Sequence, residues 1–159
     1  MPNPSAEKAH VRHMTAADVP RVMEIAASLP EAPHWPEKAY LGVLNPESIP
    51  QRIALVADGQ HPGHVDGFTV ASLLLPQAEL ELIAVSAGSQ RQGLGRMLFD
   101  ALLCELRKSG VLEIVLEVRA SNRTALAFHR SAGFGQIGLR AAYYVDPIED
   151  AMLMRLQLA

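Results

Sequence analysis

The feature that most constrains this fold is a glycine-rich junction between an apolar strand and an amphipathic helix, in the stretch LIAVSAGSQRQGLGRML at residues 82–98. Glycines at a strand-to-helix turn let backbone N–H groups approach an anion closely, and the first turn of the helix adds its dipole. Arg91 and Arg96 add positive charge. The junction therefore predicts a turn that suits a pyrophosphate, and its plainer interpretation is a structural turn without a ligand.

Two other glycine motifs are excluded at this junction. No Lys-Ser or Lys-Thr follows the glycines, so the sequence lacks the phosphate loop of NTPases. The spacing also lacks the third glycine of a dinucleotide-binding fingerprint.

The overall composition narrows the class of protein. With 14 basic and 17 acidic residues, the net charge of -3 favours no direct contact with nucleic acid. No apolar run approaches the ~20 residues of a membrane span, and the start of the sequence lacks the apolar core of a signal peptide. A lone cysteine, Cys104, cannot form an internal disulfide. We therefore expect a cytoplasmic protein without a membrane partner.

One domain is expected over residues 1–159, since no linker, repeat or low-complexity tract divides the chain. The predicted strands are HVRHM, RIALVAD, GFTVASLLL, AELELIAV, VLEIVLEV, IGLRAAYY and DAMLMRLQL. Helices are predicted after an N-cap at Thr15, from Glu37 to Leu44, over QGLGRMLFDALLCELRKSG, and from about Asn122 to Ser131. Strands before and after helices indicate an α+β or mixed-sheet domain.

The motif Gln-x-x-Gly-x-Gly at residues 90–95 resembles the acyl-CoA pyrophosphate loop of the GNAT acetyltransferase superfamily. The segments MTAADVPRVMEI, LEVRASNRTALAFHRSAGF and AAYYVDPIEDAMLM extend the likeness to the bacterial N-terminal alanine acetyltransferases that modify a small-subunit ribosomal protein. The resemblance implies a mixed, mostly antiparallel central sheet flanked by helices. It also implies acetyl-CoA as co-substrate, no metal, and a protein N-terminus, such as that of a ribosomal protein, as acceptor.

The resemblance leaves two alternatives open. A related enzyme would acetylate a small amine or a lysine side chain instead of a protein N-terminus. A non-catalytic regulatory module would bind acyl-CoA without transferring the acyl group.

The same resemblance assigns roles to individual residues. Glu117 falls where the family carries its general base, and His129 falls where it carries a tyrosine as general acid. His129 is thus a departure; either form of imidazole has an N–H for the leaving thiolate, and a solvated surface histidine is the alternative interpretation. A second departure is SAG at residues 86–88, where relatives usually have Asp-Pro. Cofactor contacts are implied for Ile83, Ala84, Val85, Arg91, Gln92, Gly93, Leu94, Gly95, Arg96 and Asn122.

Alternation along two strands adds carboxylates to the candidates. In VLEIVLEV, Glu117 is predicted on the face opposite Leu116 and Val118. Glu79 and Glu81 are expected to share a face with Ile83 and Val85; they are alternative bases, and a solvated edge explains them equally well. Tyr143 and Tyr144 are candidates for the lining of an acceptor channel or for simple packing.

Two further groups are interpreted as structural. Cys104 follows Met97 and Ala101 at helical spacing, so we expect it on the apolar stripe of that helix as a small packing residue. His61, His64 and Asp66 lie in a Pro/Gly-rich hairpin loop without an evident fourth ligand, so no metal site is predicted.

Overall fold

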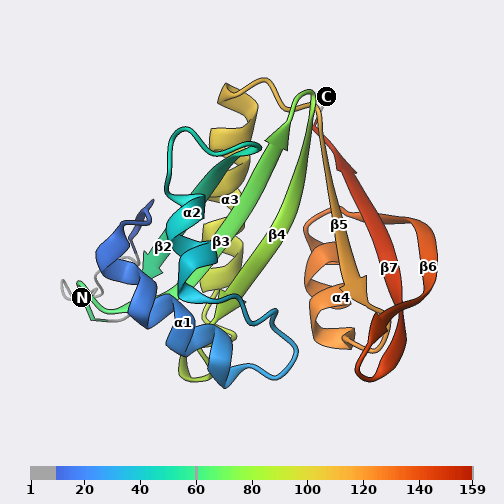
Figure 1. Ribbon diagram of the computed structural model, residues 1–159, viewed down its shortest axis with the longest axis horizontal. Coiled ribbons are helices and arrows are strands. Elements are labelled where there is room, and N and C mark those ends of the chain that lie inside the picture. The colour runs from blue at the N-terminus through green and yellow to red at the C-terminus, as the bar shows by residue number, and fades with distance from the viewer. Residues whose placement is uncertain (1–9, 60, 159) are drawn as a thin grey trace, which may run out of the picture.

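A seven-stranded sheet forms the centre of the part of the chain that the computed structural model describes, residues 10–59 and 61–158 (Figure 1). Its order is β1-β2-β3-β4-β5-β7-β6, and only the β4–β5 pair is parallel. The predicted mixed, mostly antiparallel α+β fold is thereby confirmed. The strands are β1 (Val11–His13), β2 (Gln51–Asp58), β3 (Val65–Leu74), β4 (Gln77–Val85), β5 (Glu113–Arg119), β6 (Gly135–Val145) and β7 (Ile148–Gln157).

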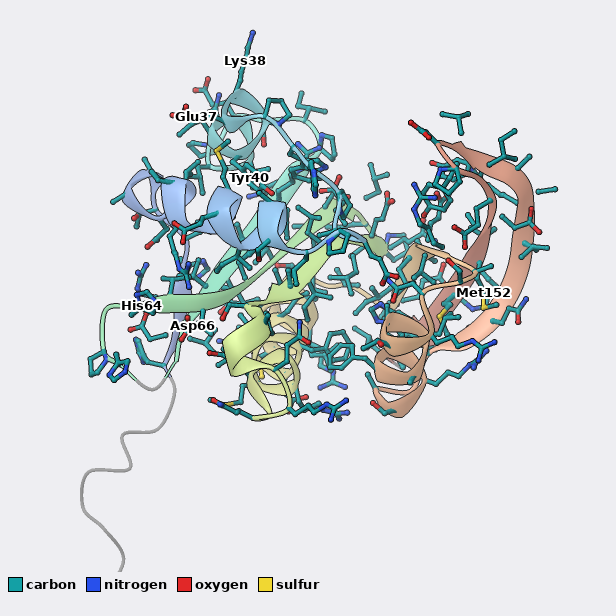
Figure 2. The ribbon with its side chains drawn as sticks, turned by 90° about the horizontal axis from the view of Figure 1, so that it is seen from below. Glu37, Lys38, Tyr40, His64, Asp66 and Met152 are labelled. Carbon is teal, nitrogen blue, oxygen red and sulfur yellow. The ribbon has the colours of Figure 1, made fainter. Side chains whose placement is uncertain are left out.

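Helices cover both faces of the sheet. With the colours of Figure 1, Figure 2 shows α1 and α2 on one face and α3 and α4 on the other; we call these the α1/α2 face and the α3/α4 face. The predicted helices are all present within a few residues of their expected bounds. They are α1 (Val19–Ser28), α2 (Glu37–Val43), α3 (Leu94–Lys108) and α4 (Arg123–Ser131), with short 3-10 turns η1 (Ala16–Asp18) and η2 (Ala87–Ser89).

Two apolar cores fix the orientation of β2, β3 and β4, and the core on the α3/α4 face also fixes that of β5 and β7. Alternate residues of a strand enter opposite cores, so the face of each polar residue between them is determined. The core on the α3/α4 face includes Leu98, Phe99, Leu102, Leu106, Ile114, Leu116 and Val118. The core on the α1/α2 face includes Val22, Ile25, Tyr40, Val56, Phe68 and Val70.

The predicted apolar stripe of α3 is only partly correct. Leu98 and Leu102 are buried, but Met97 is 36% exposed and Cys104 is exposed as well. Cys104 lies two residues after Leu102, which is about 200° around a helix of 3.6 residues per turn, so it faces away from the sheet. The expectation that Cys104 is a packing residue is therefore wrong.

The feature of the sheet that matters most for function is the divergence of β4 and β5. They pair only where residues 77–79 face residues 113–115. Beyond that point β4 stays paired with β3, and β5 with β7, so the two parallel strands separate toward their carboxyl ends (Figure 1). The glycine-rich turn follows the end of β4, and α4 follows the end of β5. The divergence thus brings the two sequence motifs to one end of the molecule.

Candidate active site

The glycine-rich turn is shaped for an anion. Gly93 has a φ of 79°, and apart from its chain neighbours no heavy atom lies within 4 Å of the place where a Cβ would be. Arg91 is exposed and also left-handed, with a φ of 65°. Met97 N–H donates to the Gly93 carbonyl, so the amides of Leu94 and Gly95 belong to the first turn of α3, where a helix offers no internal partner. Open space, free amides and a nearby guanidinium fit a pyrophosphate.

Two glutamine side chains hold the glycine-rich turn through hydrogen bonds to backbone carbonyls. Gln90 Nε2 donates to the Val85 carbonyl at 3.1 Å, and Gln92 Nε2 donates to the Gly88 carbonyl at 3.5 Å. Gln92 was expected to bind the cofactor, whereas Gln90 was missed as a functional residue although it begins the motif. Its contact with the last residue of β4 shows that the motif needs an amide there to hold the loop against the strand.

Arg96 joins α3 to α4. Its Nε donates to Asp100 Oδ1 at 3.1 Å, and its Nη1 donates to the Ser131 carbonyl at 3.3 Å. Of the two arginines predicted to face the pyrophosphate, Arg91 is therefore the one whose guanidinium is available. Arg96 fixes the distance between the helix after β4 and the helix after β5.

The last residues of β4 present backbone to the divergence. The side chain of Ala84 is buried against the α1/α2 face, and those of Ile83 and Val85 pack against the α3/α4 core. Within residues 10–59 and 61–158, no strand pairs with the β5-side edge of β4 beyond Glu79. The N–H and C=O groups on that edge therefore have no strand partner and can bind an extended ligand, although the Val85 carbonyl already accepts from Gln90 Nε2. Leu94 is buried too, so only its backbone can contact a ligand.

Glu117 lies on the α1/α2 face of β5, as its alternation predicts, because Leu116 and Val118 enter the opposite core. Arg140 Nη1 lies 3.5 Å from Glu117 Oε1. The pKa of Tyr143 is raised, first by its hydrogen bond to Glu117 and then by the charge of that carboxylate. Glu117 is thus held between a cation and a phenol of β6.

A bulge in β6 places these two partners. Arg140 pairs with Ala151 and Tyr144 pairs with Glu149, so β6 advances by four residues where β7 advances by two. Within the bulge Ala142 has a φ of 51°, and its N–H donates to Asp150 Oδ1 at 2.9 Å. The bulge turns the Arg140–Tyr143 segment toward β5.

Glu79 and Glu81 join Glu117 on the α1/α2 face. Glu81 Oε2 accepts a hydrogen bond from Arg52 Nε at 2.9 Å. The pKa of Glu79 is raised, first by partial burial and then by the charges of Glu81 and Glu117. These contacts bring the three predicted carboxylates together.

The expected shared face of Glu79, Glu81, Ile83 and Val85 is wrong. Opposite β3, Leu82 pairs with Val70 and Leu80 with Ala71, so β4 has one extra residue there. Such a bulge reverses the alternation, which sends Ile83 and Val85 to the α3/α4 core and leaves both glutamates on the other face.

His129 lies in the core of the α3/α4 face. It is 6% exposed, and its Nδ1 is buried without a hydrogen-bond partner among the described residues. The rings of Phe128 and Phe134 approach it edge-on, with centroids at 5.5 and 5.6 Å. Burial lowers the pKa of His129 to about 4, so its imidazole is neutral at pH 7. The interpretation of His129 as a solvated surface residue is wrong.

Asn122 and Tyr144 occupy the two sides of the end of β5. Asn122 Oδ1 accepts a hydrogen bond from Ala125 N–H at 3.1 Å and so caps α4. Tyr144 stacks under Arg119, whose guanidinium carbon lies 4.1 Å from the ring centroid. Tyr144 therefore packs against Arg119 at the end of β5, and the expectation that it either lines a channel or packs is met by packing.

The hairpin-loop residues have structural partners. Asp66 Oδ1 accepts from Arg21 Nη2 at 3.1 Å and lies 3.4 Å from His64 Nε2 (Figure 2). Across the residues that the structure describes, no group of three or more His, Cys, Asp or Glu side chains is arranged to hold a metal ion. No described helix is long and apolar enough to cross a membrane.

Comparison with known proteins agrees with this geometry. A [Ribosomal protein bS18]-alanine N-acetyltransferase of Salmonella typhimurium is 35% identical over 148 residues, 92% of this chain and 95% of the relative. The Escherichia coli protein of the same name is 43% identical over 99 residues, 61% of this chain and 67% of the relative. The crystal structure of the ribosomal-protein-S18-alanine N-acetyltransferase from Escherichia coli superposes with a TM-score of 0.82 at 32% identity, covering 96% of this chain and 95% of that one.

The expectation of an acetyl-CoA-dependent N-acetyltransferase is confirmed at the level of the family. The family profile described as "Acetyltransferase (GNAT) family" matches residues 20–134, which include the glycine-rich turn, Glu117 and His129. The chain belongs to the GNAT family of acetyltransferases.

Proposed function

We propose that this chain transfers the acetyl group of acetyl-CoA to the N-terminal α-amine of a protein, as the names of its bS18-alanine relatives suggest. The observation that carries the proposal is the divergence of β4 and β5. It leaves an anion-binding turn and a free strand edge next to a carboxylate on the α1/α2 face. A thioester held along β4 would meet an amine held by Glu117.

Acetyl-CoA fits the cofactor side of this arrangement. The turn around Gly93 and Arg91 would hold the pyrophosphate, with the amides of the first turn of α3. The free edge of β4 at residues 83–85 would pair with the amide groups of the pantetheine arm, as a strand would. Asn122, at the start of α4, would approach the same arm from the β5 side.

Glu117 is the proposed general base. An ammonium ion has no lone pair, so the acceptor must lose a proton before it attacks the thioester carbonyl. An α-amine has a pKa of about 7.7 to 8.0 against about 10.4 for lysine, so its deprotonation is easier by roughly 3.5 kcal/mol. This difference favours a protein N-terminus over a lysine side chain. Attack within the ternary complex forms the amide bond and breaks the thioester bond, and Glu117 takes the amine proton.

His129 is the proposed hydrogen-bond donor to the leaving thiolate, which takes its proton from solvent because a neutral imidazole that gave up its own proton would become an imidazolate. The His129 pKa of about 4 means that the donor at neutral pH is a neutral imidazole N–H, as a tyrosine hydroxyl is neutral in the family. An imidazolium donor is therefore set aside. The buried ring lies on the α3/α4 face and Glu117 on the α1/α2 face, so the two groups would act on the reacting atoms from opposite sides of the sheet.

The acceptor class is tested by mass spectrometry of the products. The purified protein is incubated with acetyl-CoA and N-terminal peptides that begin with Ala, Ser, Met or Gly, alongside free lysine and polyamines. We expect acetylation at the α-amine, strongest for the alanine peptide, with release of free CoA thiol. Acetylated lysine or polyamine alone would replace the proposed acceptor, and acetyl-CoA binding without thiol release under any condition would indicate a binding module.

A further inference from the structure

Glu149 connects the two sides of the candidate active site. Its Oε1 accepts a hydrogen bond from Ser121 N–H at 2.6 Å, and its Oε2 lies 3.4 Å from Arg119 Nη1. Its side chain is 18% exposed. Hydrogen bonding from Ser121 lowers the pKa of Glu149. The carboxylate is therefore ionised and divides its two oxygens between two different partners.

The Oε1 contact holds the turn between β5 and α4, which carries Asn122, a residue proposed to contact acetyl-CoA. Ser121 lies between the end of β5 and α4, directly before Asn122, which caps α4. The same turn is fastened by Ala120 N–H, which donates to the Asp150 carbonyl at 3.1 Å. Displacement of this turn would move both Asn122 and the helix that carries His129.

The Oε2 contact holds the acceptor side. Arg119 is two residues after Glu117 on the same face of β5, and its guanidinium stacks on Tyr144. Tyr144 faces Glu149 across the β6–β7 hairpin and ends the bulge that carries Arg140 to Glu117. The ion pair with Arg119 thus ties the hairpin to the end of β5.

We propose that Glu149 is a positioning residue for both acetyl-CoA binding and acceptor binding, through Oε1 on the Ser121 turn and Oε2 on Arg119 and Tyr144. The acceptor half of this proposal rests on the proposed function. Because a carboxylate has two separate oxygens here, its two roles can be removed one at a time.

Two substitutions separate these roles. In Glu149→Gln the amide oxygen still accepts the Ser121 N–H, while the neutral amide no longer pairs with Arg119. We expect the Kd of acetyl-CoA, from calorimetry, to stay within about twofold, and the KM of an N-terminal alanine peptide to rise about tenfold. In Glu149→Ala both contacts are lost, and we expect both constants to rise about tenfold.

Arg119→Gln provides an independent test of the acceptor side. It should raise the peptide KM as Glu149→Gln does and leave the Kd of acetyl-CoA unchanged. Together the two substitutions should cost no more than either one, since they remove the same ion pair. Arg119→Gln and Glu149→Gln test the acceptor half of the proposal even where Glu149→Ala does not fold. Glu105→Gln, which removes a carboxylate 4.0 Å from Lys108 on the surface of α3, is the matched control and should change neither constant.

The outcomes distinguish this inference from the proposed function. Equal loss of acetyl-CoA affinity in Glu149→Gln and Glu149→Ala, or no change in Glu149→Ala, would overturn this double role of Glu149. The calorimetric measurement needs no acceptor, so it tests the Ser121 contact even where the wild-type protein acetylates no N-terminal peptide. In that case the proposed acceptor is wrong, and the acceptor KM is measured with whichever amine releases CoA thiol.

Discussion

Arg140 Nη1 lies 3.5 Å from Glu117 Oε1, so a cation of the β6 bulge faces the carboxylate that we propose as general base. Glu81 on the neighbouring strand is likewise paired, with Arg52. Two of the three carboxylates on this face therefore already have an arginine partner. An acceptor ammonium must share Glu117 with Arg140, and we expect this balance of charge to favour an amine that loses its proton readily.

Replacing Glu117 by glutamine tests the base directly. Glu117→Gln keeps the shape of the side chain but removes the basic oxygen, so turnover at neutral pH should fall about 10²-fold or more. The Kd of acetyl-CoA, measured by calorimetry, should not change. Glu81→Gln is the comparison on the same face, and a larger loss of turnover there than in Glu117→Gln would transfer the role of base.

The glycine-rich turn is tested by adding a charge at Gly93. The φ of 79° disfavours any side chain but suits asparagine better than most, and the space beside Gly93 is open. Gly93→Asn is therefore the matched control for strain and size. Gly93→Asp should abolish acetyl-CoA binding in calorimetry, whereas Gly93→Asn should retain a measurable part of it, because only the aspartate repels a pyrophosphate. Equal affinity in the two variants would remove the anion site from this turn.

The start of η1 depends on a buried ion pair that should set acid stability. Both Asp18 oxygens accept hydrogen bonds from Arg12 at 2.7 Å, and this contact lowers the pKa of Asp18 to about 2. The contribution is present above the unfolded pKa near 4 and is lost as the pH falls through about 2. Asp18→Asn should therefore destabilise the protein at pH 7 by about 1 to 2 kcal/mol in urea unfolding, and its stability should vary less between pH 4 and 2. Glu24→Gln, which removes an exposed pair with Arg21, should change stability by less than about 0.5 kcal/mol.

Much of the fold and part of the site follow from local patterns. Alternation in β5 placed Glu117 correctly, and the glycine spacing located a turn with the left-handed residue that an anion site needs. The face of Glu79 was mispredicted because one extra residue in β4 reverses the alternation, and the apolar residues on either side of it give no sign of the bulge. Glu149 was missed because its two contacts join segments 28 and 30 residues away.

The sequence contains one sign that His129 is buried. His129 lies three residues after Leu126, which is buried, so the two share one face of α4. The sequence-based expectation placed His129 where the family carries its general acid, with a solvated surface histidine as the alternative, and neither interpretation included its burial. The aromatic neighbours that desolvate it, Phe128 and Phe134, adjoin it in the sequence, but only the fold shows that their edges close over the ring.

His129 should make the protein sensitive to mild acid. Its pKa is lowered to about 4 by burial, against about 6.5 in an unfolded chain, so the unfolded state binds the proton first. Stability is therefore full above about pH 6.5 and is lost as the pH falls toward 4, by up to about 3 kcal/mol. His129→Phe removes the titration, and urea unfolding of this variant should depend less on pH between 6.5 and 4 than that of the wild type. Parallel stability curves for the two proteins would show that the imidazole is accessible to water.

The same residue is tested for its part in the reaction. If the donor is a neutral imidazole N–H, wild-type turnover under saturating substrates should not fall between pH 6.5 and 8.5 through loss of a proton from His129. His129→Tyr should therefore show no gain in turnover over the wild type at the alkaline end of this range. His129→Phe removes the hydrogen-bond donor but keeps a ring in the pocket, so acetyl-CoA binding should persist while turnover falls about tenfold or more. His129→Tyr restores a donor hydroxyl of the kind that the resemblance implies for the family, and it should recover turnover relative to His129→Phe. If His129→Phe turns over as the wild type does, the thiolate needs no hydrogen bond from His129, and His129 serves only the packing of α4.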